Sequence, residues 1–342
     1  MISPWVPALP PRVVIRMDAP LAAALRSTPL FFEPLPPGAR ISAERAVKQL
    51  AAVVEVIRSV PRIDAVNVPE LVDENHEGRP YYRTGDPREY ARRIHEETGR
   101  EVIVNKVVAH LATAAAVTDW AEGTVARGVR HVVLVGGTSR YIPYPGPTVL
   151  EANRLCQPIF QGVQGSLGNI AIPQRVGEAH RMLAKTRAGA SFFTTQILFD
   201  VEAAGRMITE YDRLCREAKL TPAAVLLSVA PLGDDSDVEF ARWLGADVPE
   251  AAKREILSGP ESEAGARSVA QALRLWSTVD RERREHAPSV PLGVNVEQIT
   301  IRHLQHAREM LRAFADLLAR EKPPSGASTV PGPHRARRPL RR

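Results

Sequence analysis

Eight short apolar runs, rich in β-branched residues, alternate with amphipathic segments between Leu30 and Arg320. Alternation of this kind is typical of parallel strands that are each followed by a helix. The runs cover residues 30–33, 63–68, 102–106, 131–135, 169–172, 192–196, 225–229 and 292–296. Because eight such units close a barrel, the sequence predicts an α/β protein built as a single (β/α)8 TIM barrel.

The segments between the runs have the period of helices that pack one face against a sheet. In residues 42–58, where Ser42 is a typical N-cap, the shared apolar face consists of Val47, Leu50, Val54 and Ile57. Residues 202–218, 268–279 and 301–320 carry similar stripes. The Pro-rich stretch 141–153 breaks this period, and it predicts a rigid loop that walls a pocket.

Composition divides the chain into three parts. Residues 1–28 are Pro-rich and predict an N-terminal extension, residues 29–320 form the barrel, and residues 321–342 have the Pro, Gly and Ser content of a disordered basic tail. No run is long enough to span a membrane, and the first residues lack the apolar core of a signal peptide. We therefore expect a cytoplasmic protein with no membrane partner.

The net charge of +6 raises the question of nucleic acid binding. The last eight residues hold five arginines, and the rest of the chain is nearly balanced. Such a tail is more often a solvated extension than a binding arm, so no nucleic acid partner is expected. Cys156 and Cys215 have no Cys or His at metal spacing and are interpreted as buried thiols. The sequence leaves a homo-oligomer open.

Polar residues follow nearly every predicted strand. In a (β/α)8 barrel the loops after the strands converge on one mouth, where reactive groups lie. The residues at these ends are Glu33, Asn67, Asn105, Lys106, Gly136, Gly137, Thr138, Gln174, Arg175, Gln196, Asp200, Asp234, Asp235, Asn295, Glu297 and Gln298. The pattern predicts a polar pocket at that mouth.

Glu33 lies between two phenylalanines and a Pro-rich segment. An apolar setting raises the pKa of a carboxyl and suits it to donate a proton near neutral pH. A Glu that pairs with an Arg at the rim fits the pattern about as well.

Other polar groups carry weaker signals. Gly136 and Gly137 would let a ligand approach the backbone, or they form an ordinary tight turn. Lys185 could meet a phosphate, although lysines are common on helix surfaces. His303 and His306 share a helical face without a carboxylate partner to complete a metal site, and we interpret them as structural.

Four segments together resemble the methylenetetrahydrofolate reductases. They are LFFEPLPP (30–37), RHVVLVGGT (130–138), KTRAGASFFTTQILFD (185–200) and PLGVNVEQ (291–298). The likeness runs in order over about residues 30–318. It implies reduction of 5,10-methylenetetrahydrofolate to 5-methyltetrahydrofolate with NADH or NADPH.

By that resemblance, Glu33 is the catalytic acid that protonates the bridging nitrogen of the imidazolidine ring, and Gln196 contacts the pterin and the nicotinamide. The residues expected to complete the substrate site are Thr138, Asp235 and Asn295. Those expected at the cofactor are Asn67, Lys106, Gly136, Gly137, Ile172 and Lys185.

The chain departs from the family mainly where the flavin would lie. Gly136, Gly137 and Thr138 replace an Arg-Gly-Asp, Ile172 replaces a tyrosine, and Asp235 replaces a phenylalanine. The VGGTSR segment is similar to a flavin-independent, actinobacterial-type branch, in which the nicotinamide reduces the iminium directly. The family as a whole implies FAD, so both alternatives stay open. A folate-binding or methyl-transferring barrel without redox activity is the second hypothesis.

Overall fold

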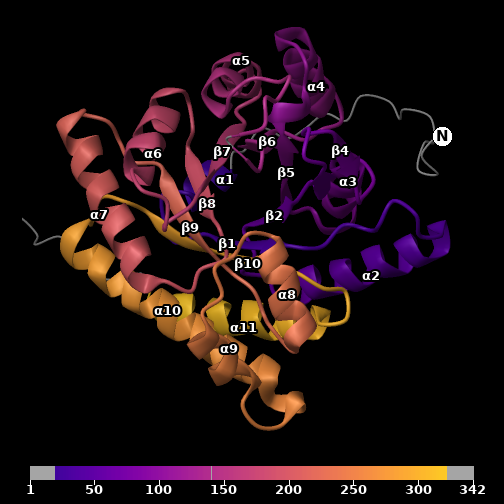
Figure 1. The fold of residues 1–342 in the computed structure, drawn as a ribbon, viewed down its shortest axis with the longest axis vertical. Helices are drawn as coiled ribbons and strands as arrows, with labels where there is room; N and C mark the ends of the chain where they lie inside the picture. The colour runs from indigo at the N-terminus through magenta and orange to yellow at the C-terminus, as the bar shows by residue number, and fades with distance from the viewer. Residues whose placement is uncertain (1–19, 140, 322–342) are drawn as a thin grey trace, which may run out of the picture.

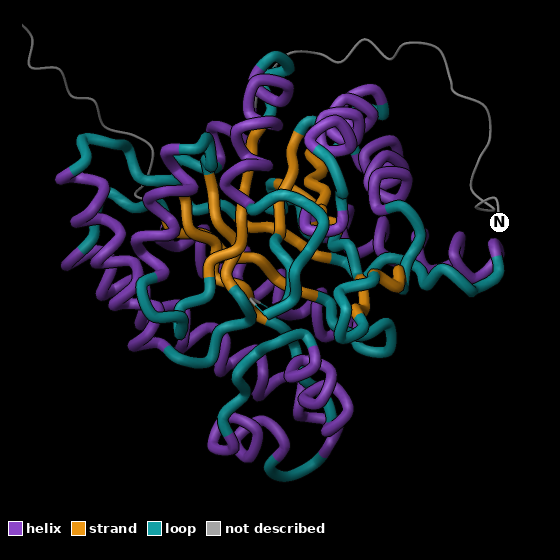
Figure 2. Tube along the Cα trace, turned by 45° about the horizontal axis from the view of Figure 1, so that its top comes forward, coloured by secondary structure: helices purple, strands orange, loops and turns teal. Residues whose placement is uncertain are grey.

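The computed structural model describes residues 20–139 and 141–321. Eight parallel strands close into a barrel in the order β1-β10-β9-β8-β7-β6-β5-β2, with helices around the outside (Figures 1 and 2). The strands are β1 (Leu30–Glu33), β2 (Ala65–Val68), β5 (Glu101–Val107), β6 (His131–Val135), β7 (Ser166–Ala171), β8 (Phe192–Thr195), β9 (Ala224–Val229) and β10 (Leu292–Glu297). The predicted (β/α)8 fold is confirmed.

One helix of the outer ring follows each strand, and all but the last of these helices return the chain to the start of the next strand. These helices are α2 (Ala43–Ser59), α3 (Pro87–Thr98), α4 (Ala114–Ala126), α5 (Val149–Gln161), α6 (Glu178–Arg187), α7 (Val201–Glu217), α10 (Ala264–His286) and α11 (Leu304–Glu321). Ser42 caps α2 as predicted, because its hydroxyl accepts the Arg45 amide at 3.3 Å. Val47 was wrongly assigned to the buried face of α2, since it is 48% exposed and Ala46 is buried in its place.

Two insertions lie at the C-terminal ends of the strands. After β2 the chain forms an antiparallel hairpin of β3 (Val72–Glu74) and β4 (Pro80–Tyr82). After β9 it forms α8 (Asp235–Trp243), α9 (Glu250–Leu257) and a short 3-10 turn. The sequence pattern predicted neither insertion, because their strands and helices are only three to nine residues long and give a weak periodic signal.

Apolar residues fill two concentric layers. Leu30 and Phe32 of β1 point outward to the helices, whereas Phe31 points into the barrel. The interior cluster includes Leu21 of α1 (Pro20–Ala24), so this short helix packs against the start of the barrel. Residues 1–19 of the expected extension and 322–342 of the expected tail lie outside the described residues.

The loop predicted over residues 141–153 is shorter in the structure. α5 begins at Val149, and Thr148 caps it with a reciprocal pair of bonds to Glu151. The stretch expected as loop up to Asn153 is therefore helical over its last five residues. Both cysteines are free and buried. In the described part of the chain, none of the helices has the length and apolar character to cross a bilayer.

Candidate active site

Glu33 ends β1 at the mouth of the barrel, and its carboxylate is held from both sides. Its Oε2 accepts Asn67 Nδ2 at 2.6 Å from β2 and Asn295 Nδ2 at 2.8 Å from β10. These strands are the two neighbours of β1 in the barrel. Because Glu33, Asn67 and Asn295 all project inward, strand closure brings residues far apart in the sequence onto one carboxylate.

The surroundings of Glu33 favour its protonated form. Burial raises the pKa of Glu33 from 4.5 to about 7, and the bonds from Asn295 and Asn67 oppose this rise. The rim arginine considered as an alternative is not found: within residues 20–139 and 141–321, Glu33 bonds to amides and not to a cation. A carboxyl with a pKa of about 7 can donate a proton at neutral pH.

A second carboxyl lies beside Glu33. The parallel register of β1 and β10 pairs Glu33 with Glu297. Asn295 Nδ2 lies 3.4 Å from Glu297 Oε1. Burial raises the pKa of Glu297 well above its ordinary value, and the charge of Glu33 adds to that effect. The sequence identified Glu297 only as a strand-end residue. Glu297 lies two residues after Asn295, and alternate residues share a face of a strand. This spacing was the signal in the sequence that Glu297 points into the barrel with Asn295.

A layer of polar side chains continues from Glu33 across the barrel interior. In the described chain, four of its buried oxygen atoms lack a hydrogen-bond partner: Oδ1 of Asn67, Asn105 and Asn295, and Oγ1 of Thr194. An unpaired buried polar group costs about 1–3 kcal/mol. Such a layer is typical of a site completed by a polar ligand or by water.

The bond from Asn67 gives a testable effect on Glu33. We expect Asn67→Leu to raise the pKa of Glu33 by about one unit, since a bond to a charged group contributes roughly 1.5–3 kcal/mol and one pKa unit is about 1.4 kcal/mol. Carbon-13 NMR titration of the side-chain carboxyls would measure this, with Glu33→Gln to assign the signal. An unchanged or lowered pKa would show that Asn67 does not stabilise the carboxylate.

Lys106 and Thr138 both bond acidic side chains of this protein. Thr138 belongs to the glycine loop, the segment Gly136–Gly137–Thr138 after β6. Lys106 Nζ pairs with Glu70 Oε1 at 2.7 Å, and both side chains are less than one-tenth exposed. Thr138 Oγ1 donates to Glu74 at 2.6 Å, and Tyr144 donates to the same carboxylate at 2.5 Å. Both expected ligand-binding side chains, Lys106 and Thr138, are therefore engaged by acidic residues of the segment after β2.

The two loop glycines differ in how much room they have. Neither adopts a positive φ, but a Cβ added at Gly137 would collide with the Tyr144 ring. Gly136 has more space, since its nearest contact would be Val149 at 3.4 Å. Glu74 also bonds His110 at 2.7 Å, and both of these side chains are buried. The glycine loop is thus covered by Tyr144 from its own βα loop and tied to the β3–β4 hairpin.

Gln196 and Asp235 bond residues outside the Glu33 cluster. The amide of Gln196 donates to the Leu244 carbonyl at 2.8 Å, and its oxygen accepts the Ile197 amide at 2.9 Å. Asp235 pairs with Lys253 at 2.6 Å, and its side chain is 75% exposed. Neither side chain bonds Glu33 in the described chain, and their roles at a substrate stay predictions.

The last two expected cofactor positions lie around β7 and α6. Lys185 Nζ donates to the Ile170 carbonyl at 2.7 Å and lies 3.5 Å from the buried Glu178. Burial lowers the pKa of Lys185, against the opposing effect of Glu178. Ile172 follows β7 and is half-buried. Lys185 therefore has partners inside the protein at the position where the resemblance places a phosphate.

The expectation that His303 has no carboxylate partner is wrong. His303 Nδ1 lies 2.5 Å from Asp237 Oδ2, and Asp234 lies close enough to complete a three-residue group. His303 also precedes α11 and so does not share a helix with His306, although the two rings stack. Arg302 lies 3.2 Å from Asp234 and supplies positive charge there. The sequence missed this group because the loops after β9 and β10 bring it together.

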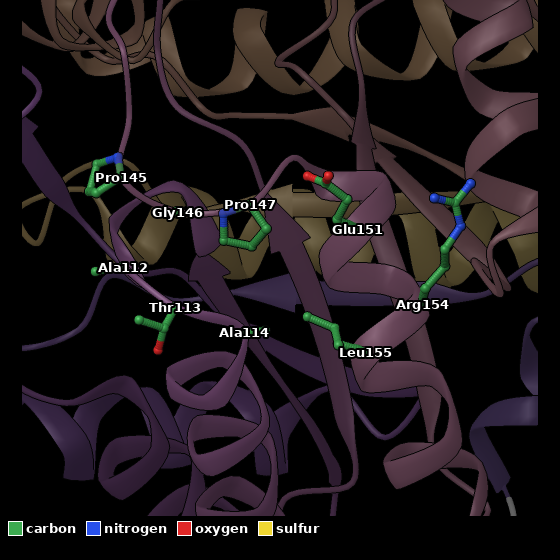
Figure 3. A pocket seen from close by; sticks show the side chains of 9 residues that line it. All are labelled: Ala112, Thr113, Ala114, Pro145, Gly146, Pro147, Glu151, Arg154 and Leu155. Atoms are coloured by element: carbon green, nitrogen blue, oxygen red, sulfur yellow. The ribbon is translucent and has the colours of Figure 1, made fainter.

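A separate hollow of about 500 Å³ lies where α4 and α5 begin. Figure 3 shows Glu151 and Arg154 of α5 along one side of it. Its lining consists of Ala112, Thr113, Ala114, Pro145, Gly146, Pro147, Glu151, Arg154 and Leu155. None of the predicted site residues lines this hollow, so the candidate site stays at the Glu33 cluster.

Comparison with known proteins supports the fold. No protein-family model matches the chain, and no curated protein matches its sequence. Among solved structures, the fold is similar to that of an uncharacterized protein from Clostridium thermocellum that binds two copies of 5-methyl-5,6,7,8-tetrahydrofolic acid. The TM-score is 0.70 at 17% sequence identity, over 86% of this chain and 98% of the other. At this identity, the likeness establishes the shared barrel architecture.

Proposed function

We propose that this protein is an oxidoreductase related to the methylenetetrahydrofolate reductases, which reduces 5,10-methylenetetrahydrofolate to 5-methyltetrahydrofolate with NADH or NADPH. The observation that carries the proposal is the half-buried Glu33 carboxyl, held by two asparagines at the barrel mouth with a pKa of about 7. The Clostridium thermocellum protein of similar fold binds 5-methyltetrahydrofolate, the product of this reaction. The expected location is the cytoplasm.

In the proposed reaction Glu33 donates its proton to the bridging nitrogen of the imidazolidine ring. The bond from that nitrogen to the methylene carbon breaks, and the nitrogen keeps the electron pair. The resulting iminium accepts hydride from the nicotinamide, which gives the methyl group and oxidised NAD(P)+. Asn67 and Asn295 hold the Glu33 carboxyl in place, and their Oδ1 atoms, which have no partner in the described chain, can accept N–H groups of a folate.

Two of the charged side chains at positions expected to contact FAD already have partners in the chain. Lys106 pairs with Glu70, and Lys185 bonds the Ile170 carbonyl. Gly137 lies under the Tyr144 ring. These contacts count against a flavin at these positions. We therefore favour direct transfer of hydride from the nicotinamide, which is itself a two-electron donor.

Two measurements test the flavin. We expect the purified protein to lack flavin absorption in the visible range, and to oxidise NADH or NADPH with methylenetetrahydrofolate when no FAD is added. Added FAD should leave the rate unchanged. A stoichiometric flavin in the purified protein, or a rate that depends on added FAD, would contradict direct transfer while leaving the reduction itself in place.

A folate-binding barrel without redox activity is the second candidate. It is favoured by the fold's likeness to a protein described only as binding methyltetrahydrofolate, and by the engagement of Gln196 with Leu244. Calorimetry with 5-methyltetrahydrofolate, together with nicotinamide oxidation assays, separates the two. Binding without any oxidation of NADH or NADPH would favour this second function.

A further inference from the structure

Glu33 and Glu297 form a close pair of carboxyls with an amide between them. They are register partners on adjacent parallel strands, and such strands lie about 4.8 Å apart. Asn295 Nδ2 lies 2.8 Å from Glu33 Oε2, 3.0 Å from Ser228 Oγ and 3.4 Å from Glu297 Oε1. One amide group therefore faces both carboxyls.

The groups packed around this pair do not neutralise it. β2 contributes Asn67 and β9 contributes Ser228, and neither is charged. In the loops beyond β9 and β10, Asp237 and His303 bond each other, while Arg302 lies beside Asp234. The charge that acts on Glu297 is that of Glu33. Two carboxylates this close, with no cation from the described chain between them, cannot both ionise easily.

We propose that Glu33 and Glu297 share a proton, and that Glu297 is a positioning residue that keeps this proton on the pair at a pH where a lone Glu33 would be ionised. This inference rests on the proposed function in one respect: the proton is delivered to the bridging nitrogen of the folate. When Glu33 has given up its proton, its carboxylate regains one from Glu297, which is refilled from solvent. The pair thus ends each cycle in its starting state.

The pKa shifts agree with this geometry. Burial raises the pKa of Glu33 to about 7, and burial followed by the charge of Glu33 raises that of Glu297 well above the ordinary value. In a coupled pair these values belong to the pair as a whole. The first proton therefore leaves near pH 7, and the second stays on the pair at higher pH.

The kinetic test is the pH profile of Glu297→Gln. Glutamine keeps the shape and the bonding capacity toward Ser228 and Asn295 but cannot hold the shared proton. We expect kcat/KM to stay within about twofold of wild type at pH 6 and to fall at least about tenfold at pH 8.5, since each pH unit above the pKa costs about a factor of ten in the protonated form. Glu297→Asp should restore most of the alkaline activity.

Glu210→Gln is the matched control. Glu210 lies on the outer helix α7 and pairs with Arg213, so the same change of charge there should leave the profile unmoved. A Glu297→Gln profile that coincides with wild type from pH 6 to 8.5 would overturn the proposal. An equal loss of activity at every pH would also overturn it, because a purely structural role would produce that result.

An infrared titration tests the pair without turnover. A carboxylic acid C=O band from the pair, assigned by its change in Glu33→Gln and Glu297→Gln, should persist in the wild-type protein at pH 8.5. In Glu297→Gln the band that remains, that of Glu33, should vanish as the pH rises above about 7. Loss of the wild-type band by pH 8 would refute proton sharing. A persistent band in a protein that lacks reductase activity would refute the proposed function and leave the pair standing.

Discussion

Glu33→Gln should lower the turnover of methylenetetrahydrofolate with NADH or NADPH by about 10²–10⁴-fold, the usual contribution of a general acid. Glutamine can still accept the bonds from Asn67 and Asn295 that hold the carboxyl now. It cannot give a proton to the bridging nitrogen. The loss should therefore appear in kcat, and folate affinity should stay near that of the wild type.

Three measurements are needed to interpret that variant. Steady-state assays of nicotinamide oxidation give the rate, calorimetry with 5-methyltetrahydrofolate gives the affinity, and circular dichroism with thermal unfolding reports the fold. Glu210→Gln should match wild type in all three, since Glu210 lies on the outer face of α7. A Glu33→Gln enzyme with wild-type turnover would refute the assignment of Glu33 as the acid.

The fold could be predicted because each strand has a short-range signal. β1 and β6 have the predicted bounds, and the other six strands differ by one to three residues at one or both ends. Such runs are buried on both faces, so most of their residues are apolar. α8 and α9 were missed because they lie in one connection and are only nine and eight residues long, too short for a clear helical period.

The site was only partly predictable, for a physical reason. Strand alternation shows that Asn67 and Asn295 point into a barrel, but only closure shows that both meet one oxygen of Glu33. The pairing of Glu33 with Glu297 depends on the register between the first and last strands. Contacts over such sequence separations leave no periodic signal in a single sequence.

Several predicted residues have partners that the sequence could not reveal. Lys106 pairs with Glu70 in the segment that leads into the β3–β4 hairpin, and that hairpin has no strong pattern. Gln196 bonds Leu244 at the end of α8. In both cases an insertion at the barrel mouth occupies a strand-end side chain. The resemblance identified the positions, whereas the insertions determine what those side chains touch.

Inside the barrel, a layer of apolar side chains that includes Phe31 and Phe192 packs next to the polar layer around Glu33. Phe31 lies two residues before Glu33 on the same inward face, and its ring meets that of Phe192 edge to face at 5.9 Å. Both rings are fully buried. Phe192 also covers Gly168 of β7, where an added Cβ would collide with its ring. The Phe192 ring therefore leaves no space for a side chain at position 168.

We expect Phe192→Ala to lower the free energy of unfolding by about 3–5 kcal/mol, the range for removing a buried aromatic ring. Urea unfolding followed by circular dichroism would measure the loss. Tyr81→Ala on the β3–β4 hairpin, where the ring is 53% exposed, should change stability by less than about 0.5 kcal/mol. A loss below about 1 kcal/mol for Phe192→Ala would show that the ring does not support the barrel interior.

A second substitution makes that test specific to the contact. Gly168→Ala alone should destabilise the protein by about 1–3 kcal/mol, because the new methyl group collides with the Phe192 ring. In the Phe192→Ala background the same methyl group enters the space left by the ring, so Gly168→Ala should there be neutral or stabilising. Such a difference between the two backgrounds is the coupling expected of residues that share one packing space. If Gly168→Ala costs the same in both backgrounds, strain elsewhere in β7 accounts for it and the two residues do not pack together as described.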